Sequence, residues 1–268
     1  MLETYKKSWS ILFKNISIFL PTIVEFIIIY LLFLLTFYFA NLTLSKQPID
    51  QLSSLIETVK ATYPAITIFF IINFIITAFT KSLRLGYIKQ AISNNKISIM
   101  KDLKSGINNF KSVLLTKVLI FLLYSVTISL LTTLLVIVSI LLQFANFTKN
   151  NALELNGYFF IFFIILAVII IALSTLNTYP AIFLKGLKGK KAFSYSYNLF
   201  KSNKKELIKT VIALIITIAL FSLISYLLSL IFSGNTHGII NLLLAVILTT
   251  WPDTYIFFKF KDLKSPKS

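Results

Sequence analysis

The sequence predicts an all-α, polytopic membrane protein: six transmembrane helices form three hairpins, each preceded by a basic amphipathic interfacial helix. Two features of composition favour this class. Of the 268 residues, 57% are hydrophobic and 13% are charged, whereas soluble domains average roughly 45–50% and roughly 25%. Several uncharged apolar stretches also exceed the length of about 18 residues that marks a transmembrane candidate. We therefore expect one integral membrane domain over residues 1–268.

The distribution of basic residues predicts the orientation. The net charge of +17 would suggest a nucleic-acid partner in a soluble protein. Here Lys and Arg gather near the N-terminus, in residues 81–117 and 185–209, and in the tail, whereas the alternate connections hold only Lys46, Lys60 and Lys149. This positive-inside pattern indicates an even number of helices with both termini cytoplasmic. We expect a multi-pass plasma-membrane protein whose partner is the lipid bilayer, including anionic lipids, with no nucleic acid.

Residues 2–14 begin the first predicted unit as a helix on the membrane surface. Apolar residues recur there at steps of three and four, and lysines lie on the other side. The first membrane helix is expected over 16–40. Pro64 then opens a shorter helix over 64–80, whose end continues into the second basic stretch.

The second unit is predicted to begin after the turn signal Asn94-Asn95. An amphipathic helix starting at Ile99 leads into membrane helices over 113–143 and 157–184. The third unit follows two chain-breaking glycines with a basic amphipathic helix that ends near Ser202. Its membrane helices are expected over 207–233 and, after an external turn over 234–238, to about residue 258.

Short sequence matches favour an internal repeat. A Phe-Lys pair followed by Asn or Ser closes each basic segment, at residues 13–15, 110–112 and 200–202. Such matches point to a repeated structural unit, although a chain rich in Phe, Lys and Ser also produces them by chance. The predicted repeat units are 1–95, 96–188 and 189–268.

A family resemblance rests on six membrane segments, a basic lead-in before an early proline, and an amphipathic helix in mid-chain. The residues that carry it are Phe13, Lys14, Pro21, Ala192, Ser196 and Phe200. Together they resemble the uncharacterised six-helix membrane domains related to the membrane domain of glycerophosphoryl diester phosphodiesterases. The resemblance covers nearly the whole chain. It implies a stand-alone membrane domain and lends no catalytic residues, because the membrane domain is not the catalytic part in that family.

Ionisable residues inside a bilayer are functional candidates, because each costs roughly 2.5–3.5 kcal/mol at the centre on insertion scales. The candidate intramembrane polar site consists of Glu25, Lys117 and Asp253. All three fall in the cytoplasmic half, so Lys117 is in range of either acid. Three prolines are expected to kink the helices near them: Pro21, Pro180 and Pro252. One reading is a proton or cation relay beside freed carbonyls. The reading we favour is a buried ion pair, or a Lys that extends its ammonium group to the membrane surface, that locks the bundle.

Eight residues of the basic segments are predicted to lie at the lipid headgroups. They are Lys6, Lys7, Trp9, Lys101, Lys104, Lys190, Lys191 and Lys201. Anchoring and orienting the chain accounts for them, and recruitment of anionic lipid is the functional alternative, at about 1 kcal/mol per basic residue.

Catalytic and metal chemistry are not indicated. The chain has no Cys and a single His, His237, in a predicted external turn over 234–238. No hydrolase, zinc-peptidase or phosphate-binding motif is present. We therefore expect a non-enzymatic integral membrane protein, accessory or lipid-organising, with no cofactor or metal. The alternative is a small permease or ion-coupled transporter that uses the intramembrane acids.

Overall fold

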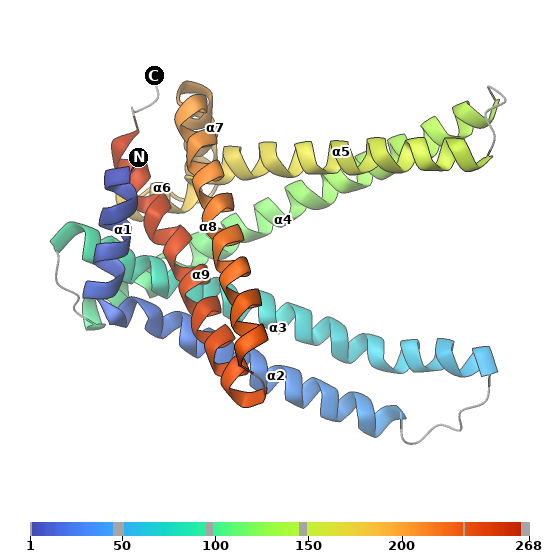
Figure 1. The fold of residues 1–268 in the computed structure, drawn as a ribbon, viewed down its shortest axis with the longest axis horizontal. Helices are drawn as coiled ribbons and strands as arrows, with labels where there is room; N and C mark the ends of the chain where they lie inside the picture. The colour runs from blue at the N-terminus through green and yellow to red at the C-terminus, as the bar shows by residue number, and fades with distance from the viewer. Residues whose placement is uncertain (1, 45–50, 95–98, 145–148, 233, 264–268) are drawn as a thin grey trace. The chain divides into compact units, whose positions relative to one another are not determined.

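The structure is a computed structural model that describes residues 2–44, 51–94, 99–144, 149–232 and 234–263 (Figure 1). Throughout these residues the regular secondary structure is helical, as the sequence predicts. The elements are α1 Leu2–Lys14, the 3₁₀ helix η1 Ile16–Phe19, α2 Leu20–Leu44, α3 Gln51–Asn94, α4 Ile99–Phe144, α5 Lys149–Thr175, α6 Thr178–Lys185, α7 Lys190–Ser202, α8 Lys204–Ile231 and α9 Gly234–Asp262.

Six helical segments of the described chain are long and apolar enough to cross a membrane. They are Ile16–Tyr38, Tyr63–Ser93, Ile99–Leu141, Phe160–Lys185, Lys204–Ile231 and Gly238–Asp262. Their outward surfaces are apolar, with Leu130 66% and Leu230 67% exposed, while Thr22 and Thr250 are fully buried. An apolar exterior around buried polar groups is what a hydrocarbon solvent demands. The membrane class predicted from composition is thus supported by helix length and burial.

Several predicted helix limits are wrong, and α5 begins at Lys149 where the sequence predicts a start at residue 157. α3 begins at Gln51 and passes through Pro64 without ending, because one proline removes only one backbone hydrogen bond from a helix. α4 continues from Ile99 to Phe144, so the predicted second surface helix and the membrane helix after it are one element. Between residues 107 and 144 the sequence contains no Pro and no Gly that would end the helix. α9 begins at Gly234, so the predicted turn 234–238 is helical.

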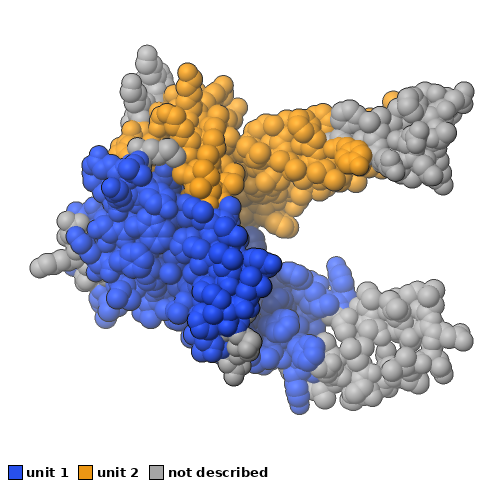
Figure 2. Space-filling view, in the orientation of Figure 1, with its two compact units in different colours: residues 1–114, 217–258 blue, residues 115–216, 259–268 orange. Residues whose placement is uncertain are grey.

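The chain forms two compact units (Figure 2). Unit 1 contains residues 1–114 and 217–258, and unit 2 contains residues 115–216 and 259–268. The three-unit repeat stays a prediction from sequence. These two units are defined by which residues contact one another, and such contacts do not test whether segments of the sequence resemble one another.

In unit 1, α1 packs against α9 through aromatic side chains. Trp9 and Trp251 stack with ring centroids 5.3 Å apart, and Tyr5 meets Trp251 edge-on at 5.2 Å. The indole nitrogen of Trp251, which is fully buried, donates to Ser8 Oγ at 3.1 Å. A buried indole N–H needs such a partner. One face of α1 is therefore a packing face within the protein.

In unit 2, a hydroxyl group bridges a break in one of the candidate membrane segments. The predicted helix over 157–184 is interrupted between α5 and α6, and Pro180 lies in the first turn of α6. Ser196 of α7 donates to the Ser174 carbonyl at 2.7 Å and accepts from the Asn177 N–H at 3.2 Å. Unpaired backbone groups cost free energy when they are buried. The Ser196 side chain therefore stabilises the break and holds α7 against it.

Candidate functional site: a buried ion-pair network

Three helices of unit 1 each contribute two polar residues spaced three positions apart. These pairs are Thr22 and Glu25 on α2, Lys81 and Arg84 on α3, and Thr250 and Asp253 on α9. Residues three apart lie on the same face of an α-helix. The three polar faces meet, and Arg84 is at their centre.

Arg84 joins all three helices. Its Nε and Nη2 each lie 2.9 Å from Asp253 Oδ2, and its Nη1 donates to Thr22 Oγ1 at 3.0 Å. The same Nη1 is 3.3 Å from Glu25 Oε2. The side chain of Arg84 is only 5% exposed, so these partners replace the water that the guanidinium has lost.

The rest of the network balances its charge. Lys81 Nζ lies 3.7 Å from Asp253 Oδ1, and the hydroxyl groups of Thr22 and Thr250 are 2.9 Å apart. Two basic and two acidic side chains sum to zero formal charge. A neutral, hydrogen-bonded group of this kind can persist in a low-dielectric interior where a lone charge could not.

Glu25 and Asp253, two of the residues singled out from the sequence, therefore lie in one site, and Arg84 is the residue between them. Lys117 is half-buried in α4 and belongs to unit 2. Sequence reasoning missed Arg84 because it falls in a basic stretch that was assigned to the cytoplasmic surface. The signal that could have found it is the polar pair spaced three apart that recurs on each helix.

The three prolines lie in different settings. Pro21 is in the first turn of α2, directly after η1, where a missing N–H costs least. Pro180 follows the break described above. Pro252 lies inside a continuous α9, beside Asp253. Pro21 and Pro180 thus lie at helix starts, and Pro252 lies in the interior of its helix.

The predicted headgroup residues are mostly exposed. The seven lysines of that set are all exposed, whereas Trp9 is half-buried in the aromatic cluster. Lys7 Nζ lies 2.6 Å from Glu3 Oε1, and this hydrogen bond holds the pKa of Glu3 below its usual value. Charge on α1 is thus partly compensated.

Three hollows with mostly apolar linings lie beside the candidate membrane helices. The largest, about 850 Å³, is in unit 1 between α2, α3 and α9 and is lined by side chains such as Ile23, Phe33, Phe69 and Val246. A second, about 480 Å³, lies between α2, α3 and α4. The third, about 470 Å³, is in unit 2 between α4 and α7. None of these three is lined by a member of the ion-pair network.

Within the described residues, no group of three or more His, Asp and Glu side chains could hold a metal ion. His237 lies in α9 by its backbone, and its side chain is outside the described set. No protein-family model, curated protein or solved structure matches this chain.

Proposed function

We propose that this chain is a non-enzymatic integral membrane protein that organises lipid. The observation that carries the proposal is the 850 Å³ hollow between α2, α3 and α9, whose lining is apolar along its length. Its volume lies in the range of ligand pockets, roughly 300–1,000 Å³. An apolar hollow offers water no hydrogen-bond partners, so the occupant it suits is a hydrocarbon chain of the bilayer.

The ion-pair network supports the same proposal as a structural lock. Arg84 engages both acids and a threonine, and Asp253 also lies near Lys81. Each acid is thus held by a basic partner that bridges α2, α3 and α9, which is a packing role. The alternative, an ion-coupled permease, draws on four ionisable side chains gathered within membrane segments, which is an arrangement that transporters use. The resemblance to the phosphodiesterase membrane domains remains a proposal that agrees with a non-catalytic role.

The lipid proposal predicts that purified protein retains phospholipid through detergent exchange. A bulky substitution in the hollow, Ile27→Trp, should lower the retained lipid per protein several-fold, measured by mass spectrometry of extracted lipid. Ile161→Trp is the matched control, because Ile161 is 56% exposed on α5 and does not line the hollow. Equal retention in wild type and Ile27→Trp would contradict the proposal.

A flux experiment distinguishes the permease from the lipid-organising protein. In proteoliposomes, wild type and Glu25→Gln should show the same proton and cation flux as protein-free vesicles. A flux in wild type that Glu25→Gln abolishes, with both proteins equally folded, would instead establish the transporter.

We also propose that both termini are cytoplasmic. Because the chain has no Cys, single cysteines report topology cleanly. A Cys at position 237 should react with an impermeant maleimide on intact cells, and one at position 191 only after permeabilisation. The reverse pattern would overturn the orientation.

A further inference from the structure

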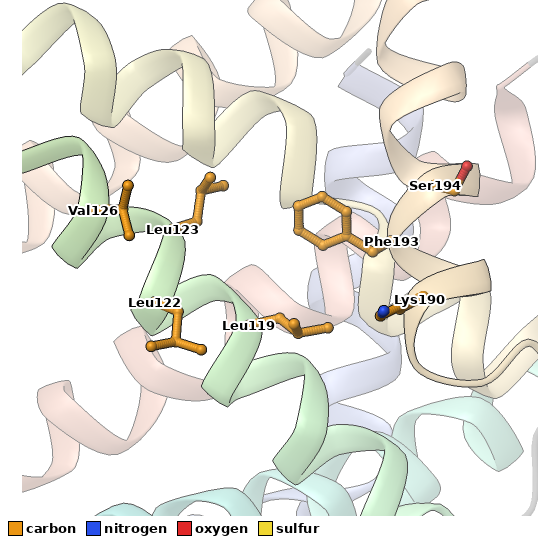
Figure 3. Close-up of a pocket in the computed structure, with 7 residues that line it drawn as sticks. All are labelled: Leu119, Leu122, Leu123, Val126, Lys190, Phe193 and Ser194. Atoms are coloured by element: carbon orange, nitrogen blue, oxygen red, sulfur yellow. The ribbon is translucent and has the colours of Figure 1, made fainter. Parts of the chain in front are cut away.

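The hollow between α4 and α7 in unit 2 combines an apolar wall with a polar end (Figure 3). Leu119, Leu122, Leu123 and Val126 of α4 form the wall. Opposite them, Lys190 and Phe193 project from α7 toward α4, whereas the hydroxyl of Ser194, at the border of the hollow, points away from that wall. The other two hollows described above have no charged residue in their lining.

The dimensions suit the start of a single hydrocarbon chain. From Leu119 to Val126 the wall extends about 10 Å along the α4 axis at 1.5 Å per residue. The hollow measures about 470 Å³. Its polar end lies at the first turn of α7, next to Gly189, where an added Cβ would meet Leu115 Cδ2 at 2.9 Å. The Leu115 side chain of α4 therefore lies against Gly189 at that end.

The charge at the polar end is positive and uncompensated. From Lys185 to Lys205 the sequence contains seven lysines and no acidic residue. Two of these lysines already lie over aromatic rings: Lys185 over Tyr195 at 5.3 Å and Lys201 over Tyr197 at 4.5 Å. Lys190 is exposed and, among the described residues, forms no ion pair with a carboxylate. The N-terminus of α7 adds partial positive charge beside it.

We propose, building on the lipid-organising function above, that this hollow binds one anionic phospholipid, with an acyl chain along α4 and the phosphate at Lys190. The ammonium group of Lys190 can donate to phosphate oxygens in charge-assisted hydrogen bonds. The apolar wall then takes the chain that the phosphate carries. A water-soluble phosphate compound would leave that wall unused, and a neutral hydrocarbon would leave Lys190 unused.

The test uses the full-length protein in nanodiscs of phosphatidylcholine that contain a photoactivatable phosphatidylglycerol or a matched photoactivatable phosphatidylcholine. Adducts are mapped by mass spectrometry of peptides. In wild type, residues 115–126 should carry more adduct from the anionic lipid than from the zwitterionic one. One lysine near the headgroups contributes about a five-fold preference, so Lys190→Gln should lower that preference by about five-fold.

Lys201→Gln is the matched control, because it removes the same charge from the same helix but does not line the hollow. Equal losses in the two variants would mean that diffuse positive charge attracts the lipid, and the site would be overturned. So would an absence of adducts on residues 115–126. After either of these outcomes, lipid retained in the hollow of unit 1 would still support the proposed lipid-organising function. If neither hollow retained lipid, both the site proposed here and the lipid-organising function would be contradicted.

Discussion

Replacing Arg84 by Met should lower the free energy of unfolding by about 3–5 kcal/mol, since removal of one partner leaves the others buried and uncompensated. The arginine is 5% exposed and reaches Asp253, Glu25 and Thr22 at once. Met preserves much of the side-chain volume, so the loss reports the charge and its hydrogen bonds. The measurement is the unfolding transition of the purified protein in detergent, together with the monodisperse fraction obtained on purification.

Neutralising Arg84 together with both acids should recover most of this loss. The charge that remains is on Lys81, whose side chain is 27% exposed. In the triple variant Arg84→Met, Glu25→Gln and Asp253→Asn, the acids no longer carry the charge that Arg84 balanced. Lys104→Met is the matched control, because it also removes one positive charge from unit 1 but from an exposed position, and we expect a change within about 0.5 kcal/mol. A triple variant no more stable than Arg84→Met alone would show that the network is not an electrostatic unit.

The contrast between the single and triple variants also bears on function. If the network is a lock, lipid retention should follow stability, falling in Arg84→Met and returning in the triple variant. A triple variant that is stable but has lost a biological activity would indicate that the acids do more than hold α2, α3 and α9 together.

Much of the fold is predictable because it depends on local properties. Helix α1 begins and ends at the predicted residues, 2 and 14, and α7 ends at Ser202 after following Gly186 and Gly189, which have positive φ angles of 67° and 50°. Hydropathy identifies the apolar segments in the same way, since each depends only on its own composition. The prediction is wrong where a local signal is not decisive, as in α4, which passes through Phe110-Lys111-Ser112 without ending.

The candidate site is predictable only in part, because it depends on which helices are neighbours. Glu25 and Asp253 stand out in sequence as rare acids in apolar segments. Their partner Arg84 lies 59 and 169 positions away from them along the chain, and hydropathy assigns it to the surface. Only the packing of α2, α3 and α9 shows that its side chain turns into the protein.

The crossing of α3 and α4 offers the second large effect, because two glycines let the backbones approach closely. A Cβ on Gly86 would lie 2.7 Å from the Asp102 carbonyl oxygen, and one on Gly106 would lie 2.7 Å from Leu83 Cα. Both contacts are with backbone atoms, which cannot rotate away as a side chain can. The Ser82 hydroxyl also donates to the Gly106 carbonyl at 2.7 Å, and this bond is lost if the helices separate.

We therefore expect Gly86→Ala and Gly106→Ala each to lower the free energy of unfolding by about 1–3 kcal/mol, the usual cost of overpacking. Gly238→Ala is the matched control on α9, where nothing lies within 4 Å of an added Cβ. There the better helix propensity of Ala, up to about 1 kcal/mol, should leave stability unchanged or raised. A Gly→Ala change is thus expected to lower stability at the contact between α3 and α4 and to leave it unchanged or raised at Gly238.

The double variant sharpens this test. Once one methyl group has separated α3 from α4, the second meets less resistance, so Gly86→Ala with Gly106→Ala should cost less than the sum of the single changes. Full additivity, measured from the same unfolding transitions, would mean that the two glycines do not share one helix contact. Stabilisation by either single change would mean that α3 and α4 do not approach as closely as 2.7 Å requires.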